Sequence, residues 1–368
     1  MRKGWEYKRW KEVLTIINGK NQSAVVDENG EYPIYGSGGI MGYANNWLCP
    51  ENCVIIGRKG NINKPIFVET KFWNVDTAFG LNANIEYLLP KFLFYFCLDY
   101  NFERHNKAVT IPSLTKADLL KIDIPLPPKS TQLAIVSELD KINELIRLKK
   151  EQLKDFDNLA QSLFYEIFGD PVENEKGWEV KKLNDICDVR DGTHDSPKYL
   201  QNSEYILITS KNIVNGRIDF ENVNYISEED YIKINKRSKV DNGDIIMPMI
   251  GTIGNPIIAH IDETHKFCIK NVALIKFLAD STVNNIFIVN LMRCSSFNNY
   301  LLNQNKGGTQ KFVALGAIRK LPIPLPPLPL QRLFAQRIEQ IEREKSEVQK
   351  SIQDLETLLA SRMQYWFE

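Results

Sequence analysis

Apolar residues recur at alternating steps of three and four along two stretches of the chain. In residues 135–167 only Lys149 interrupts the apolar series, and in residues 334–366 only Lys345 and Arg362 do so. An unbroken 3-4 alternation of this length is typical of a coiled-coil seam. The seam positions are Ile135, Leu139, Ile142, Ile146, Lys149, Leu153, Phe156, Ala160, Leu163 and Ile167, then Phe334, Ile338, Ile341, Lys345, Val348, Ile352, Leu355, Leu359, Arg362 and Trp366. The pattern predicts two long helices with apolar seams that need a partner.

The two predicted helices suit each other as partners, because the second seam repeats the first at an offset of 199 residues. Each helix would be about 57 Å long at a rise of 1.5 Å per residue. If the second helix returns antiparallel to the first, the helices form a rod with a globular domain at each end. The alternative is that each helix packs on its own globular domain.

Proline-rich strips precede both helices. The string Ile-Pro-Leu-Pro-Pro occupies residues 124–128 and again residues 323–327, and proline inside a helix would break it. Ser130 is a candidate N-cap for the first helix. Gly169 followed by Pro171 is a signal that this helix ends.

The chain contains two copies of one pattern, which indicates an internal repeat. The matching strings are Gly4-Trp5-Glu6 with Gly177-Trp178-Glu179, Val54-Ile55-Ile56 with Ile245-Ile246-Met247, and Asn106-Lys107 with Asn305-Lys306. The offset between copies grows from 173 to 191 to 199 residues. The second copy therefore carries insertions, and we expect the first of them within residues 216–244.

Each copy begins with a globular segment that mixes short apolar runs with Gly, Asn and Pro turns. The runs expected to form strands are Val54–Ile56, Ile66–Val68, Tyr205–Thr209, Ile245–Met247 and Val272–Phe277. The predicted fold is two tandem α/β (α+β) domains, joined by two long helices in an antiparallel coiled coil with pseudo-two-fold symmetry. The predicted segments are 1–128 (domain), 129–169 (helix), 170–327 (domain) and 328–368 (helix).

The composition is that of an ordinary globular protein, with 43% apolar and 25% charged residues among 368. Disorder is therefore not expected. Lys and Arg number 46 against 46 Asp and Glu, which argues against binding nucleic acid by bulk attraction but leaves local basic patches open.

Membrane, secretory and metal-binding features are not evident in the sequence. The longest apolar run, residues 92–98, falls far short of the roughly 20 residues that a membrane helix needs. The first twenty residues contain no continuous apolar segment of a secretory signal. Six cysteines have no spacing of a zinc site. We expect a cytoplasmic protein with reduced thiols and no metal.

Two related domains held at a fixed distance suit a target that also has two-fold symmetry. Duplex DNA has local dyads, so each domain could read one groove segment. Because the two domains differ in their loops, they would read two different half-sites, and the helices would set the spacing between them.

Several strings give the chain a specific resemblance. They are the repeated Ile-Pro-Leu-Pro-Pro followed by Gln132 or Gln331, Asp191-Gly192-Thr193-His194-Asp195-Ser196-Pro197, Thr209-Ser210-Lys211-Asn212-Ile213, Gly243-Asp244-Ile245-Ile246 with Gly251-Thr252-Ile253-Gly254, and Gly57-Arg58-Lys59-Gly60. With the tandem arrangement, they make the chain similar to the specificity subunit of type I restriction–modification systems over essentially its whole length. The family usually has Glu before the repeated Gln, where this chain has Thr131 and Leu330.

The resemblance implies a non-catalytic reader of DNA. Each target-recognition domain would bind one half of a bipartite, asymmetric sequence in double-stranded DNA. Two modification subunits would dock on the helices and supply S-adenosylmethionine-dependent methylation of adenine N6. Two restriction (motor-nuclease) subunits would complete the complex.

The chain's own residues agree with a protein that does no chemistry and binds no cofactor. It has no Gly-x-x-x-x-Gly-Lys-Ser/Thr loop for nucleotide phosphates. It also lacks the Asn-Pro-Pro-aromatic string of adenine methyltransferases, and its four histidines have no metal or triad spacing. Two rival functions remain open, a protein-interaction scaffold without a DNA role and a fused methyltransferase or nuclease.

Candidate DNA contacts in the first domain follow a predicted strand. Arg58 and Lys59 lie between two glycines, with Asn61 and Lys64 close behind. Arginine can bond the O6 and N7 atoms of guanine, whereas lysine favours phosphate. A solvated basic turn is an equally good interpretation. In the second copy, Thr252 and Asn255 replace Asn61 and Lys64.

The second domain has two polar loops with candidate contacts, and a further set of candidates recurs in both copies. Thr193, His194, Ser196 and Lys198 form a loop suited to groove contacts, although capping and turn roles explain Thr193 and Ser196 equally well. Lys211 and Asn212 follow a strand, and asparagine can read the edge of adenine. The positions that recur in both copies suit phosphate contact or framework, and they are Lys107, Thr110, Lys306, Thr309 and Gln310.

Overall fold

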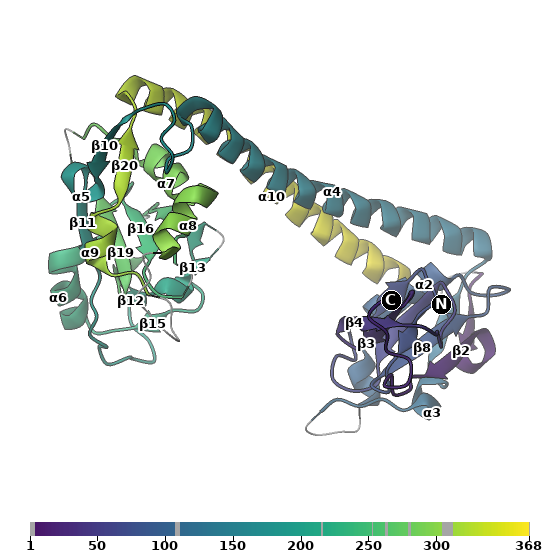
Figure 1. Ribbon diagram of the computed structural model, residues 1–368. Helices are drawn as coiled ribbons and strands as arrows, with labels where there is room; N and C mark the ends of the chain where they lie inside the picture. The colour runs from purple at the N-terminus through teal and green to yellow at the C-terminus, as the bar shows by residue number, and fades with distance from the viewer. Residues whose placement is uncertain are drawn as a thin grey trace. The chain divides into compact units, whose positions relative to one another are not determined.

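The computed structural model describes residues 4–106, 111–214, 216–251, 253–261, 264–278, 281–303 and 312–367 (Figure 1). The chain divides into two compact units. Unit 1 comprises Met1–Lys150 with Lys350–Glu368, and unit 2 comprises Glu151–Gln349. Two long helices, α4 (Lys129–Phe168) and α10 (Leu328–Phe367), each begin in one unit and end in the other.

Unit 1 is a mixed α/β domain. Its elements are β1 (Glu6–Arg9), α1 (Trp10–Val13), β2 (Leu14–Asn18), β3 (Tyr32–Gly36), β4 (Gly39–Ala44), β5 (Cys53–Gly57), β6 (Ile66–Val68), β7 (Trp73–Asn74), β8 (Ala78–Ala83), α2 (Pro90–Asp99), a 3₁₀ helix η1 (Phe102–His105), α3 (Lys116–Leu119) and β9 (Asp123–Leu126). The strands form an antiparallel sheet in the order β2-β8-β5-β6, a sheet β4-β3-β7 and the pair β1-β9. Strands β3 and β7 are parallel.

Unit 2 builds the same arrangement from the second copy. Its elements are β10 (Glu179–Lys182), α5 (Leu183–Ile186), β11 (Asp188–Asp191), β12 (Tyr205–Ile208), η2 (Ser210–Asn212), β13 (Ile213–Val214), β14 (Arg217–Ile218), β15 (Asn224–Tyr225), α6 (Glu228–Ser238), β16 (Ile245–Pro248), β17 (Ile257–Ile258), β18 (Lys266–Ile269), β19 (Val272–Lys276), α7 (Asn285–Arg293), α8 (Ser295–Asn303), α9 (Leu315–Arg319) and β20 (Pro322–Leu325). The antiparallel sheet β11-β19-β16-β17 matches β2-β8-β5-β6, and the parallel pair β12-β18 matches β3-β7.

The two copies also share their strand register. Glu6 pairs with Leu126 in unit 1, and Glu179 pairs with Leu325 at the equivalent place in unit 2. The predicted internal repeat and its five predicted strands are therefore confirmed, each strand to within one residue at either end.

The insertion predicted within residues 216–244 contains helix α6. Ser227 caps its N-terminus by accepting a hydrogen bond from the Asp230 backbone N–H at 3.1 Å. Acidic residues occupy its first turn and basic residues its last, which complements the helix dipole. The helix packs Tyr231 and Ile234 against strands β12 and β18. Unit 1 has no helix between β4 and β5.

The ends of both long helices belong to the hydrophobic cores of the two units. In unit 1 the core includes Leu139 of α4 and Met363 of α10, and the Phe367 ring lies 5.3 Å from that of Phe92. In unit 2, Phe168 of α4 and Phe334 of α10 are in ring contact at 5.2 Å inside the core. Packing of the helices on the globular domains, offered above as the alternative, therefore occurs at the helix ends.

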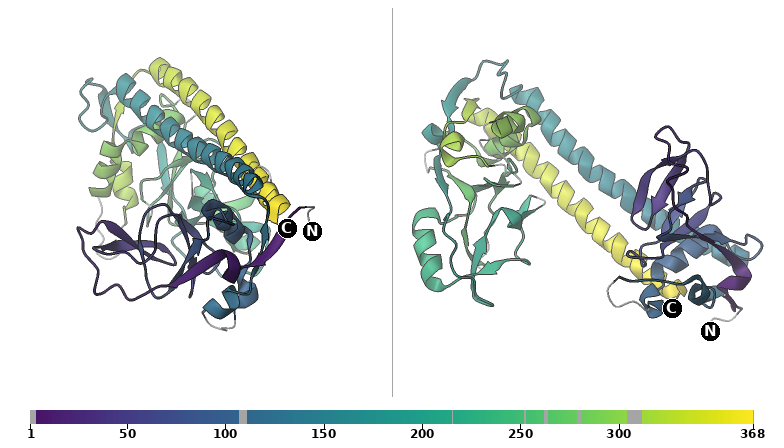
Figure 2. Two further views of the ribbon diagram at one scale, coloured as in Figure 1. Left: turned by 90° about the vertical axis from the view of Figure 1, so that its right-hand side faces the viewer. Right: turned by 60° about the horizontal axis from the view of Figure 1, so that its bottom comes forward.

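The predicted seam is confirmed along both helices, because none of its twenty residues is exposed. The helices lie side by side in all three views (Figures 1 and 2). Lys150 pairs with Glu356 at 2.8 Å in unit 1, and Asp157 pairs with Lys345 at 2.8 Å in unit 2. Since the α10 number falls as the α4 number rises, the helices are antiparallel, as predicted.

The start of α4 differs from the sequence prediction. The helix begins at Lys129, so Ser130 lies in its first turn and is not the N-cap. A buried glutamine joins the first turn to its surroundings. Gln132 accepts a hydrogen bond from the Leu89 backbone N–H at 2.9 Å and donates to the carbonyls of Tyr87 and Pro127 at 2.8 and 3.0 Å.

The second helix repeats this glutamine contact. Gln331 is fully buried, like Gln132. It accepts from the Asn284 backbone N–H at 2.9 Å and donates to the carbonyls of Thr282 and Pro326 at 3.3 and 2.8 Å. In both copies one side chain thus joins the proline strip, the first turn of the long helix and a loop of the domain. At the other end of α4, Gly169 adopts a positive φ of 77° and ends the helix, as predicted.

Replacement of Gln132 by leucine tests this joint. The variant keeps a side chain of similar size but leaves one backbone N–H and two carbonyls without this hydrogen-bond partner. We expect the free energy of unfolding to fall by about 3 kcal/mol, because each buried group without a partner costs about 1–3 kcal/mol. Urea denaturation followed by circular dichroism measures the loss. The exposed Gln349→Leu is the control and should cost no more than about 0.5 kcal/mol. Equal effects would contradict the role of Gln132.

Candidate nucleic-acid interface

The basic loop of unit 1 is held by its backbone. Residues 58–64 leave β5 and lead to β6. The Arg58 backbone N–H donates to the Thr77 carbonyl at 2.8 Å, and the Gly60 N–H donates to the Pro112 carbonyl at 3.1 Å. A Cβ at Gly57 would lie 2.3 Å from the Asn61 carbonyl oxygen, so the close turn requires glycine. These contacts fix the main chain without using the basic side chains.

The side chains of Arg58, Lys59, Asn61 and Lys64 are all exposed. The Arg58 guanidinium lies 5.9 Å from the centre of the Phe79 ring, and one nitrogen donates a long hydrogen bond of 3.4 Å to the Asp76 carbonyl. The sequence-predicted cluster is therefore a real surface feature with hydrogen-bond donors free to reach a ligand.

Unit 2 keeps the framework of this loop but not its charge. The Val313 backbone N–H donates to the Met249 carbonyl at 3.0 Å, as Leu114 does to Arg58 at 2.9 Å. Met249 is buried, while Asn255 is exposed. The other candidates of this region lie outside the described residues, and they are Lys107, Thr110, Thr252, Lys306, Thr309 and Gln310.

The second polar loop begins at a point fixed by the sheet. The Thr193 backbone N–H donates to the Ile269 carbonyl at 3.1 Å, and the Asn271 N–H donates to the Thr193 carbonyl at 3.1 Å. A Cβ at Gly192 would lie 2.2 Å from the Ile269 carbonyl oxygen, which explains the glycine. The exposed Lys198 lies further along the loop, and Ser196 accepts a hydrogen bond from the Lys270 ammonium group.

His194 bridges two acceptors in this loop. Its Nδ1 lies 2.8 Å from Oδ1 of Asn271, and its Nε2 lies 2.8 Å from Oδ2 of Asp191. Both acceptors favour the doubly protonated ring, which donates from both nitrogens. The hydrogen bond to Asn271, followed by that to Asp191, raises the pKa of His194.

Helix α6 contributes basic residues that were not among the sequence candidates. Lys233 and Arg237 border a hollow of about 280 Å³ together with Thr193 and Ser196. Arg237 forms an ion pair with Asp191, the same carboxylate that bonds His194. From the sequence, this segment was predicted only to be an insertion. The spacing of the two basic residues at i and i+4 on one helix was the available signal.

Asn212 has a structural role here. It is 3% exposed, its Oδ1 accepts from the backbone and the hydroxyl of Thr209 at 3.0 Å, and its Nδ2 donates to the Asn222 carbonyl at 2.9 Å. An amide engaged in this way has no free edge for adenine, so we leave Asn212 out of the surface proposed below. The neighbouring Lys211 is exposed.

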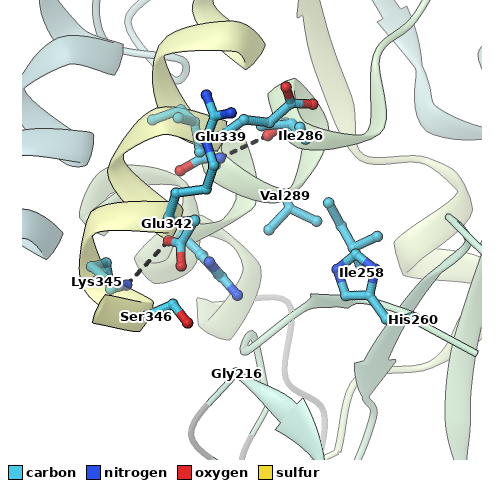
Figure 3. Close-up of a pocket in the computed structure, with 13 residues that line it drawn as sticks. Gly216, Ile258, His260, Ile286, Val289, Glu339, Glu342, Lys345 and Ser346 are labelled. Carbon is cyan, nitrogen blue, oxygen red and sulfur yellow. Dashed lines mark hydrogen bonds and ion pairs between the residues drawn. The ribbon is translucent and has the colours of Figure 1, made fainter. Parts of the chain in front are cut away.

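A larger hollow of about 690 Å³ lies beside α10 within unit 2 (Figure 3). Ile258, Ile286 and Val289 supply apolar surface, and Glu339 and Glu342 line it from α10. Arg293, Arg343 and Lys345 line it as well, so its charges are mixed, and none of the DNA contacts predicted from the sequence is among its lining residues.

Other classes of site find no support in the described part of the chain. No group of three His, Cys, Asp or Glu side chains could hold a metal ion. The six cysteines are free and buried, and burial raises the pKa of Cys53 to about 12. Among the same residues, no helix has the length and apolar character that crossing a membrane requires.

Comparison with known proteins agrees with this architecture. A family model described as the type I restriction modification DNA specificity domain matches residues 2–155 and 175–357. The type I restriction enzyme MjaVIII specificity subunit of Methanocaldococcus jannaschii is 25% identical over 96% of this chain and 92% of its own length. The MjaIX specificity subunit of the same organism is 24% identical over 90% of this chain and 85% of its own.

A solved structure shares the fold. The S subunit of a type I restriction-modification system from M. genitalium superposes with a TM-score of 0.59, covering 99% of this chain and 96% of that chain at 14% sequence identity. The predicted fold class of two α/β domains joined by two antiparallel long helices is thereby confirmed.

The His194 contacts predict a titration. In NMR spectra the ring of His194 should titrate above its ordinary value of 6.5, and Asp191→Asn should lower that pKa. Because the folded-state pKa is raised, the contribution of His194 to stability is complete below the unfolded-state pKa and is lost as the pH rises through the folded-state pKa. His194→Gln assigns the resonance. A His194 pKa at or below 6.5 in the unmodified chain would contradict the geometry.

Proposed function

Because the chain belongs to the type I restriction modification DNA specificity family and is a specificity subunit, not a catalytic one, we propose that each globular domain reads one half of a split DNA sequence. The observation that carries the proposal is one framework built twice with different exposed side chains. Arg58 and Lys59 in the first copy stand where Met249 and Ile250 stand in the second. Two such domains would read different half-sites, which makes the whole target asymmetric.

Reading would depend on local contacts, since the net charge of the chain is zero. Phosphate contacts would position each domain, and contacts to base edges would provide the sequence discrimination. The donors that would bind double-stranded DNA are exposed on both units. They are Arg58, Lys59 and Lys64 in unit 1, and Lys198, Lys233 and Arg237 in unit 2. We also propose that the chain works in the cytoplasm, together with its DNA target.

The long helices would set the distance between the half-sites and provide the docking surface for other subunits. In this proposal the chain divides into domain 1–128, helix 129–169, domain 170–327 and helix 328–368, with a pseudo-two-fold axis relating the copies. The relatives are named as specificity subunits of type I restriction enzymes, which supports an assembly of several chains. We propose two modification subunits, which would methylate adenine with S-adenosylmethionine, and restriction subunits as partners.

The direct test is methyl transfer. The chain is co-purified with a type I modification subunit, the complex is given plasmid DNA and S-adenosylmethionine, and the modified adenines are mapped. We expect methylation within one split motif, and none when this chain is left out. A stable complex that methylates no motif, or methylation that does not depend on the chain, would overturn the proposal.

Two substitutions in unit 1 separate base contact from phosphate contact. Arg58→Ala should relax discrimination at one base pair of one half-site by about tenfold to a hundredfold, as expected for loss of a guanine contact. Lys64→Ala should weaken binding to all sequences and reduce the slope of log affinity against log salt by about 1. Methylation of a set of single-base target variants, with salt-dependent binding of the same complexes, measures both effects. Identical behaviour of the two variants would contradict these assignments.

A further inference from the structure

Helix α6 presents one face to the polar loop of unit 2. The side chains on that face lie on the i, i+4 spacing of a helix and line the hollow of about 280 Å³. They are Asp230, Lys233, Ile234, Arg237 and Ser238. The opposite wall is the loop after β11, with Thr193, Asp195, Ser196 and Pro197. Figure 1 places α6 at the end of unit 2 that lies away from α10.

Arg237 on this face is held in place. Asp191 is 4% exposed and uses both of its carboxylate oxygens, one for His194 and one for a terminal nitrogen of Arg237. The backbone carbonyl of Arg237 accepts from Arg190 at 3.0 Å, which fixes the end of the helix. The Arg237 side chain nevertheless remains 66% exposed. A guanidinium has five N–H donors, so this one is oriented by a carboxylate and keeps donors for a ligand.

The first copy has no counterpart of this arrangement. Asn18 stands at the position of Asp191, and Asn21 stands at the position of His194. No helix lies between β4 and β5 to supply an arginine. The network therefore distinguishes the second domain from the first, as a determinant of a different half-site should.

We propose that Arg237, positioned by Asp191, is a specificity-determining residue of the second domain and contacts the edge of a guanine base. The inference rests on the proposed function, because it needs DNA against this face. Asp191 acts through Arg237 and is a positioning residue.

The charges around the hollow favour a base over a phosphate. Asp195 and Asp230 border it together with Lys233 and Arg237, so its signs are mixed. A phosphate would meet two carboxylates beside the two cations, whereas the edge of a G·C pair is neutral and carries a cytosine donor beside the two guanine acceptors. A fixed orientation adds little to a contact with a diffuse charge, but it improves the directional pair of hydrogen bonds to guanine O6 and N7.

The test uses the complex with the modification subunit and DNA targets changed at one base pair at a time. Arg237→Ala should relax discrimination at one G·C pair of the second domain's half-site by about tenfold to a hundredfold, with the other half-site unaffected. Arg237→Lys should restore little of it, because a lysine ammonium lacks the planar fork that makes the bidentate contact directional. Asp191→Asn, which places the first copy's residue at this position, should relax the same base pair to a smaller extent.

Lys236→Ala is the matched control. This exposed lysine is on the same helix but does not line the hollow, so its loss should change no single base preference. Unchanged circular dichroism spectra and unfolding midpoints would exclude a folding defect in the variants.

Two results would overturn the inference. Arg237→Ala with unchanged discrimination would mean that the residue does not read the target. Equal weakening on every target, with a smaller salt slope, would identify a phosphate contact instead. Failure of the unmodified chain to direct methylation would count against the proposed function itself, and it is distinguishable because it is seen before any substitution is made.

Discussion

The burial of two apolar helical seams is the constraint on which the rest of this protein depends. Helices α4 and α10 are each 40 residues long, and neither could keep its seam in water without a large loss of stability. Each helix covers the seam of the other in its middle and enters the cores of the globular domains at its ends, where Phe168 and Phe334 meet in unit 2. The core of each domain is therefore complete only when both long helices are packed into it. Lys345, at half-buried depth in the seam, is matched by Asp157 and Glu342, which is consistent with a role in fixing register.

The same constraint explains why the buried glutamines occur in both copies. Where each long helix leaves its domain, one backbone N–H and one carbonyl of a neighbouring loop and one carbonyl of the proline strip face its first turn. An amide side chain carries both a donor and an acceptor, so Gln132 and Gln331 each satisfy groups of both kinds. A carboxylate or a hydroxyl at this place could not make all three contacts. The joint thus fixes where each long helix leaves its domain, and through that the direction in which the domain is held.

The sequence was sufficient to predict features that follow from local pattern. The seam, the strands and the end of α4 at Gly169 each depend on a periodicity or a single residue type, and all are present. Ser130 is not the cap because α4 already begins at Lys129. Arg237 was not among the sequence candidates, because the carboxylate that orients it belongs to Asp191, 46 residues away in sequence. Likewise, Asn212 has the side chain of an adenine reader, but burial commits that side chain to the turn.

The equivalent loops of the two domains can carry different side chains because main-chain hydrogen bonds determine the loop shape. The contact of Leu114 with Arg58 and that of Val313 with Met249 are backbone hydrogen bonds of nearly equal length, so a charged and an apolar residue occupy one framework. Substitutions at such positions change what the surface can bind at little cost to the fold. An insertion such as α6 goes further, because it adds a new face and covers its own apolar residues with β12 and β18. After duplication, the two domains could therefore acquire different surfaces while the helices and the glutamine joints stayed the same. That separation of framework from surface is what a protein with two different half-sites requires.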